Sequence, residues 1–115
     1  MLQVTAQSKI FIAVSPVDFR KGIDGLAALS RQALKTDPFS GSLFVFCNRR
    51  KTAIKILVYD GQGFWLCMKR LSQGKFRWWP KKGDSGQLLA SELQILLWNG
   101  NPVGAQIPGD WRKIT

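Results

Sequence analysis

The amino-acid sequence predicts a single α+β domain, in which an antiparallel β-meander of about four to five strands carries two helices on one face. Three observations lead to this fold. Segments rich in aromatic and β-branched residues follow one another with only short turns between them, as in a meander. A helical pattern stands before and after these segments. The hydrophobic content, 45% of 115 residues, is sufficient for one core.

The first predicted elements are a short strand and a helix. Lys9 to Val14 alternates polar and apolar residues, which is typical of a strand. Ser15 to Asp18 combines a capping hydroxyl, a proline and a carboxylate, so we expect a helix to begin there. Asp37 to Gly41 ends this helix, because proline cannot continue it. The apolar residues that share one side of the helix are Phe19, Ile23, Leu26, Ala27 and Leu34.

Four strands are predicted next, at Leu43 to Cys47, Ala53 to Tyr59, Phe64 to Leu71 and Lys75 to Trp79. Two-residue turns centred on Gly61-Gln62 and Gln73-Gly74 place Tyr59 opposite Phe64, and Leu71 opposite Phe76. In this register one face of the sheet is apolar and is the predicted core. Its residues are Ile54, Ile56, Val58, Trp65, Cys67, Leu71, Phe76 and Trp78, with Lys69 as an exception. The other face interleaves cations with aromatic rings.

A second helix is predicted from about Leu88 to Trp98, with one apolar side that covers the core face of the sheet. Gly100 and Pro102 end it. The glycines and prolines that follow predict irregular structure. We therefore expect one domain over residues 1–98 and an irregular C-terminal tail over residues 99–115.

The charge of the chain favours a polyanionic partner. Seventeen Lys and Arg against seven Asp and Glu give a formal net charge of +10. Nucleic acid is the first expectation, although the acidic surface of another protein or a simple gain in solubility would also account for this excess. Residues 1–8 lack the pattern of a secretory signal, and no apolar stretch approaches the ~18 residues of a membrane span. We therefore expect a cytoplasmic protein that does not contact a membrane.

The sequence gives no support for catalysis. Without histidine, the chain lacks the most common proton shuttle and metal ligand. The carboxylates are dispersed over turns and helix starts, which disfavours a nuclease or strand-transfer subunit, the least favoured alternative. Cys47 and Cys67 are expected to be buried free thiols, since an intervening strand separates them too far for a disulfide. No catalytic residue, metal or cofactor is expected.

The positive signal is a cluster of cations within the meander. Cations neutralise phosphates and release counterions, while aromatic rings among them stack on unpaired bases. We predict anion contacts at Arg49, Arg50, Lys51, Lys55, Arg70, Lys75 and Arg77, with stacking groups at Tyr59 and Trp79. Alternatively, the tryptophans belong to the core and the lysines protect the sheet edges from aggregation.

A protein–protein adaptor is the second reading of the same residues. In this case the cations contact acidic segments of a partner, and exposed aromatic side chains anchor the interface. Arg20 and Lys21 are the residues that we expect to contribute to partner binding. The sequence does not determine the oligomeric state.

Several motifs in fixed order carry a family resemblance. They are Pro16 to Leu26, Asp37 to Gly41, Leu43 to Phe46, Asn48 to Arg50, Ile54 to Leu57, Asp60 to Phe64, Lys69 to Leu71 and Gly74 to Phe76. With them the chain resembles the accessory protein of the insertion-sequence-sixty-six family, often called TnpB, from about Lys9 to Trp79 and more loosely through Leu97. Two departures are Cys47, where the family usually has arginine, and Val58-Tyr59, which replaces a pair that commonly includes tryptophan.

The resemblance implies a bacterial protein that is encoded beside the transposase of a mobile element and takes part in transposition. It implies element DNA or RNA, the transposase and other element-encoded proteins as partners, and a cytoplasmic location compatible with association with the nucleoid. No established catalytic residues come with it. The family is distinct from the RNA-guided nuclease of the same short name, a much longer chain whose carboxylate-metal site this sequence lacks.

Overall fold

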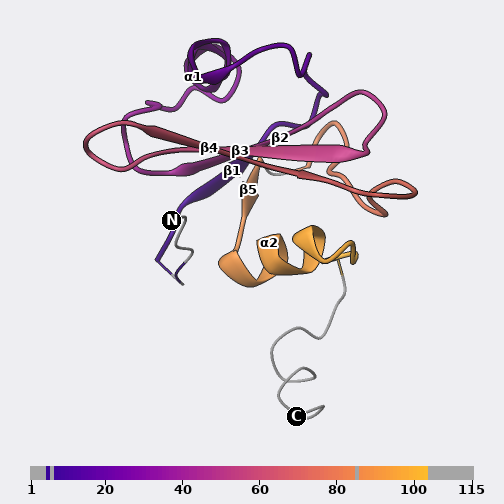
Figure 1. The fold of residues 1–115 in the computed structure, drawn as a ribbon. Coiled ribbons are helices and arrows are strands. Elements are labelled where there is room, and N and C mark those ends of the chain that lie inside the picture. Colours follow the sequence, from indigo (N-terminus) through magenta and orange to yellow (C-terminus); the bar gives the residue numbers. More distant parts are fainter. Residues whose placement is uncertain (1–4, 6, 85, 104–115) are drawn as a thin grey trace.

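The computed structural model describes residue 5 and residues 7–84 and 86–103, which form one mixed sheet with a helix on each face (Figure 1). The strand order is β4-β3-β2-β1-β5. The elements in chain order are β1 (Ile10–Ile12), α1 (Ile23–Gln32), β2 (Leu43–Cys47), β3 (Ala53–Tyr59), β4 (Phe64–Arg70), β5 (Gln87–Leu88) and α2 (Ala90–Leu97). The α+β class and the single compact domain are therefore confirmed. No helix among the described residues has the length and apolar character needed to cross a membrane.

The placement of both helices on one face was wrong, because α1 and α2 lie on opposite faces of the sheet (Figure 1). β1 pairs with β2 in parallel, so the chain between them must cross over the sheet, and it carries α1 across one face. All five residues of β2 are buried. An uninterrupted apolar run of this kind is typical of a strand that is covered on both faces.

The predicted hairpin register is confirmed for β3 and β4, where Tyr59 lies opposite Phe64. The strand predicted at Lys75 to Trp79 is absent, and with it the pairing of Leu71 with Phe76. β4 ends at Arg70, and the chain then leaves the edge of the sheet. This departure lets Phe76 and Trp79 fill the space between the sheet and α2, a burial that a flat edge strand would not give them.

The helix predicted from Pro16 begins later, at Ile23. The Val17 amide donates a hydrogen bond to the Cys47 carbonyl (2.9 Å), which ties this segment to the end of β2. Asp18 Oδ1 accepts a hydrogen bond from the Arg20 amide (2.9 Å) and stabilises a turn instead of a helix N-terminus. Residues 13–22 therefore form a loop along the end of the sheet.

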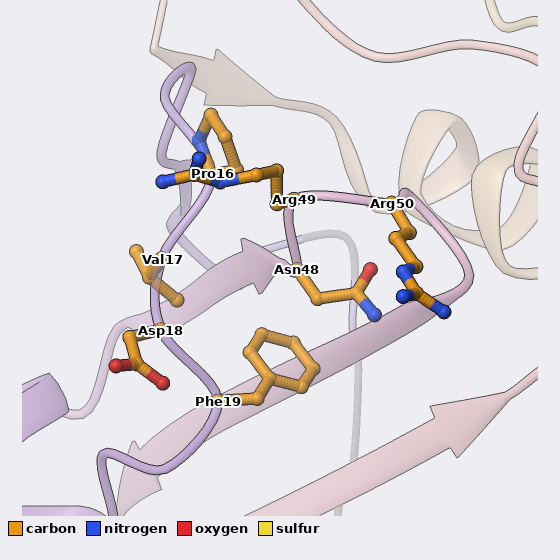
Figure 2. A pocket seen from close by; sticks show the side chains of 7 residues that line it. All are labelled: Pro16, Val17, Asp18, Phe19, Asn48, Arg49 and Arg50. Atoms are coloured by element: carbon orange, nitrogen blue, oxygen red, sulfur yellow. The ribbon is translucent and has the colours of Figure 1, made fainter.

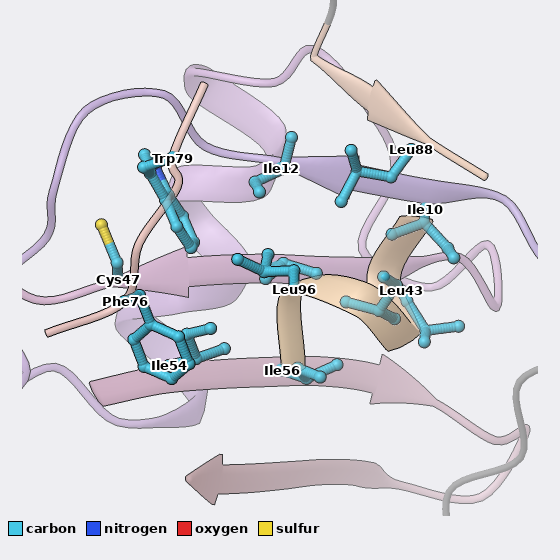
Figure 3. Packing of buried hydrophobic residues seen from close by; sticks show 12 residues of the cluster. Ile10, Ile12, Leu43, Cys47, Ile54, Ile56, Phe76, Trp79, Leu88 and Leu96 are labelled. Atoms are coloured by element: carbon cyan, nitrogen blue, oxygen red, sulfur yellow. The ribbon is translucent and has the colours of Figure 1, made fainter. Parts of the chain in front are cut away.

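The core has two layers, one on each side of the sheet. Figure 3 shows the layer under α2, in which Ile10, Ile54, Ile56 and Leu96 belong to one buried cluster with the Phe76 and Trp79 rings. The layer under α1 is built from Ala13, Leu26, Phe44, Phe46 and Leu57. Side chains alternate between the layers along β2 and β3, as a two-residue period requires. Ile54, Ile56 and Phe76 are thus confirmed as core residues.

Two residues of the predicted core face behave differently. Trp65 is 44% exposed, and its indole donates to Asp60 Oδ2 (2.8 Å) at the end of the β3–β4 hairpin, so it was wrongly assigned to the core. The Lys69 ammonium donates to the Leu97 carbonyl at the C-terminal end of α2. A cation at this position satisfies a helix carbonyl, which explains the exception on an otherwise apolar face.

The first five residues of the predicted tail lie among the described residues. Residues 99–103 form neither helix nor strand, and Asn99 adopts a left-handed φ of 63° directly after the last turn of α2. Residues 104–115 of the predicted tail lie outside the described residues. The boundary at residue 98 therefore stays a prediction.

Candidate nucleic-acid interface

Six of the predicted anion contacts lie at one end of the sheet. Arg49, Arg50 and Lys51 form the turn between β2 and β3, and Arg70 pairs with the first residue of β3. The Phe76 amide donates to the Lys51 carbonyl (2.8 Å), so the residues on either side of Phe76 adjoin the same turn. All six side chains are exposed. We call this group the basic end; it consists of Arg49, Arg50, Lys51, Arg70, Lys75 and Arg77.

Amide side chains hold the backbone of the basic end. Asn48 Oδ1 accepts hydrogen bonds from the Thr52 (2.9 Å) and Ala53 (3.2 Å) amides and so closes the β2–β3 turn. Asn99 Oδ1 accepts a hydrogen bond from the Arg77 amide (2.7 Å), and Asn99 Nδ2 donates to the Lys75 carbonyl (3.3 Å). These hydrogen bonds fix the β2–β3 turn and the segment from Lys75 to Arg77 from within the protein.

No acidic side chain in the described part of the chain forms an ion pair with these six cations. The ion pairs there join Asp18 to Arg20 (2.7 Å) and Arg31 to Asp37 (3.8 Å). The Arg20 guanidinium beside Asp18 lowers the pKa of that carboxyl to about 2, and Asp18 is therefore ionised and paired. The positive charge of the basic end is not compensated by the protein and remains available to an anion.

Lys55 and Trp79, which were predicted to contact nucleic acid, are both buried. The Lys55 ammonium is directed into the protein, where it donates to the Phe19 (2.9 Å) and Lys21 (3.1 Å) carbonyls and lies 4.8 Å from the centre of the Phe19 ring. Trp79 is only 5% exposed, and its indole donates to the Ala13 carbonyl (2.9 Å). Neither side chain can reach a bound nucleic acid, because each is committed to the interior.

Tyr59 is separated from the basic end by the length of β3. The strand begins beside the β2–β3 turn and ends at Tyr59, six residues and about 20 Å away. There the Tyr59 ring packs against Phe39 (4.9 Å between ring centres) and Phe64 (5.0 Å). The predicted association of Tyr59 with the cations was therefore wrong, although it shares a strand with Lys55.

Arg20 and Lys21, the predicted partner contacts, lie in the loop that precedes α1. Both side chains are exposed, and the Arg20 guanidinium is engaged by Asp18. The Lys21 carbonyl accepts one of the hydrogen bonds from Lys55, which anchors this loop to the sheet. The structure thus holds the loop in place and presents both cations at its surface.

The loop and the β2–β3 turn enclose a hollow of about 380 Å³ at the basic end (Figure 2). It is lined by Pro16, Val17, Asp18, Phe19, Asn48, Arg49 and Arg50. Phe19 is the aromatic residue of this hollow. From the sequence, it was expected instead on the apolar side of a helix that packs on the core. Hydrogen bonds between residues far apart in the sequence, from the Val17 amide to the Cys47 carbonyl and from the Lys55 ammonium to the Phe19 carbonyl, hold Phe19 beside the turn, and no local pattern indicates these contacts.

Both cysteines are free thiols, as predicted, but only Cys47 is buried; Cys67 is half-buried, so its predicted burial was wrong. Cys47 is buried at the end of β2, and this burial raises the pKa of its thiol to about 11, so the thiolate that a nucleophile requires is disfavoured. Cys47 lies opposite Ile54, while Cys67 lies opposite Ile56 on the far side of β3. The intervening strand keeps the two sulfur atoms apart.

Comparison with known proteins identifies the family of this chain. The model of the IS66 Orf2-like protein family, IS66 being insertion sequence sixty-six, matches residues 8–104. This chain belongs to the IS66 Orf2-like family. Two of the motifs behind the sequence resemblance, residues 16–26 and 48–50, meet across the hollow at the basic end.

Similar chains occur in Sinorhizobium fredii. The uncharacterized protein y4jC is 38% identical over 89 residues, which cover 77% of this chain and 76% of that protein. The uncharacterized protein y4hO is 35% identical over 97 residues, 84% of either chain. No solved structure matches this chain significantly. The IS66 Orf2-like family associates the protein with transposition as an accessory protein, and it is not a family of known catalytic enzymes.

Proposed function

We propose that this IS66 Orf2-like protein supports transposition by binding nucleic acid of the mobile element at its basic end. The observation that carries the proposal is the gathering of six exposed cations around one turn, without an acidic partner among the described residues. Cations that are not paired within a protein gain most from phosphate, since binding releases the counterions of the nucleic acid. The protein recruits or positions the element and leaves the chemistry to other proteins.

The form of the basic end supports a phosphate contact. Three of its cations stand on one short turn, and arginine and lysine at such a turn reach neighbouring phosphates without deforming the sheet. The guanidinium groups of Arg49 and Arg50 also offer paired N–H donors that match two phosphate oxygens. Backbone contacts of this kind give affinity and register but little dependence on base sequence.

Fluorescence anisotropy with labelled single-stranded and double-stranded DNA and RNA tests the proposal. We expect binding at low salt, and a weaker affinity for the Arg49→Gln and Arg50→Gln variants. Lys9→Gln is the matched control, because Lys9 is exposed, carries the same charge and precedes β1 at the other end of the sheet. A general effect of net charge would weaken all three variants equally and would contradict the assignment of the site.

The adaptor is the competing function, and the same experiment separates it. An adaptor would leave all nucleic acids unbound at low salt and would instead co-purify with the transposase. Charge reversal of Arg49 and Arg50 with unchanged nucleic-acid affinity would likewise remove the basic end as the binding site. Arg20 and Lys21 remain the proposed residues for a protein partner, since the loop presents both at the surface.

A further inference from the structure

The hollow beside the basic end combines two features that the six cations alone do not have. Its apolar side is formed by Pro16, Val17 and Phe19, and its cationic groups are Arg49 and Arg50, whose side chains point in different directions in Figure 2. A volume of about 380 Å³ is within the range of small-ligand sites. A ligand that fits both features needs a flat apolar part with anionic groups attached to it.

We propose that this hollow binds one unpaired nucleotide of a single-stranded nucleic acid, with its base against Phe19 and its two flanking phosphates on Arg49 and Arg50. The inference rests on the proposed function and makes it more specific, because it names the single strand as the preferred form. In a duplex the base is paired and stacked within the helix, and only the phosphates are accessible to the protein.

Phe19 is held in position by the core layer under α1, against which it packs, and by Lys55. Its carbonyl accepts the hydrogen bond from the buried Lys55 ammonium, and the same ammonium lies 4.8 Å from the centre of the ring. The ring is half-buried and forms part of the wall of the hollow. A ring that is fixed before binding loses little conformational freedom when a base stacks on it.

Within the described part of the chain, the polar side chains of the hollow other than the two arginines already have partners. Asn48 donates to Thr52 Oγ1 (2.8 Å) and accepts hydrogen bonds from the turn. The Asp18 carboxylate pairs with Arg20 and, in Figure 2, points away from the Arg50 guanidinium. Its negative charge is thereby largely compensated, so the phosphates at Arg49 and at Arg50 meet a net positive site.

The decisive measurement changes the ligand and leaves the protein intact. Wild-type protein is titrated into a labelled oligothymidylate and into an oligomer of equal length whose nucleotides are abasic, so that the phosphates are the same and only the bases differ. We expect roughly tenfold weaker binding of the abasic oligomer, the loss that is typical of one stacked base. A duplex of the same length should also bind more weakly than the single strand.

A variant locates the base contact. Phe19→Leu keeps the backbone carbonyl that Lys55 needs and most of the apolar volume, but it removes the aromatic face. We expect Phe19→Leu to bind the abasic oligomer with the affinity of the wild type. Unlike the wild type, it should bind the oligothymidylate no more tightly than the abasic oligomer. Phe39→Leu is the control, because Phe39 is an exposed aromatic residue that packs beside Tyr59, at the other end of β3.

The outcomes distinguish this inference from the function on which it rests. If base-bearing and abasic oligomers bind equally and binding still weakens with salt, the nucleotide site is overturned and the basic end stands. The site is also overturned if folded Phe19→Leu retains the full dependence on bases. If no oligomer binds at low salt, both the site and the proposed function are overturned.

Discussion

Lys55 illustrates how a single charged residue can have a structural role within a basic protein. Its ammonium satisfies the Phe19 and Lys21 carbonyls from within the sheet, and no other protein donor is bonded to these carbonyls in the described structure. Replacement by methionine keeps the apolar stem and leaves both carbonyls without this donor. We expect Lys55→Met to lower the free energy of unfolding by about 1–3 kcal/mol, measured by urea denaturation. Lys75→Met, at an exposed position, should change it by less than about 0.5 kcal/mol.

The Cys47 thiol predicts a pH dependence of stability at the scale of one residue. Burial raises the pKa of this thiol above its ordinary value of 9.0 to about 11, so the folded protein holds the proton more tightly than the unfolded chain. The thiol's contribution to stability is thus fully present below pH 9 and is lost as the pH rises toward 11. The free energy of unfolding should therefore fall more steeply over this window in the wild type than in Cys47→Ala. Parallel profiles for the two proteins would refute this.

At the scale of the element, the β2–β3 turn places a lysine where the backbone favours glycine. Lys51 has a φ of 59°, a left-handed conformation that costs a residue with a Cβ atom roughly 1 kcal/mol. We expect Lys51→Gly to leave the free energy of unfolding unchanged or to raise it by up to about 1 kcal/mol, while nucleic-acid affinity falls. A thermal melt and an anisotropy titration on the same sample measure the two effects.

Lys51→Ala is the matched control for this turn. It removes the same ammonium but keeps the Cβ atom, so its affinity should fall as in Lys51→Gly without any gain in stability. If Lys51→Gly were less stable than the wild type, the left-handed turn would not be the strained element described above. If both variants kept full affinity, Lys51 would be absent from the interface.

At the scale of the whole molecule, the arrangement of charge predicts the salt dependence of binding. If all six cations of the basic end contact phosphates of a single strand, the logarithm of the binding constant should fall against the logarithm of salt concentration with a slope near −4. Arg49→Gln and Arg50→Gln should each reduce the magnitude of the slope by about 0.7. Lys9→Gln, at the other end of the sheet, should leave it unchanged. A wild-type slope near zero would exclude phosphate contacts.

The sequence by itself determined the elements that local chemistry controls. The richness in aromatic and β-branched residues placed β2 and β3, and the turn Asp60 to Gly63 fixed the register of Tyr59 with Phe64, because a tight hairpin allows few pairings. The cations of Asn48 to Lys51 identified the basic turn, since a loop between two strands lies at the surface. Clustered motifs also indicated the family that the comparison then showed.

Only the tertiary structure decided which side chains share a surface. Lys55 and Trp79 are of residue types that are common in nucleic-acid-binding sites. Their polar atoms nevertheless donate to the Phe19 and Ala13 carbonyls, which lie more than thirty residues away in the sequence. The parallel pairing of β1 with β2 likewise sent α1 and α2 to opposite faces and brought Phe19 to the basic turn. Such contacts depend on how the whole chain closes upon itself, and no local periodicity records them.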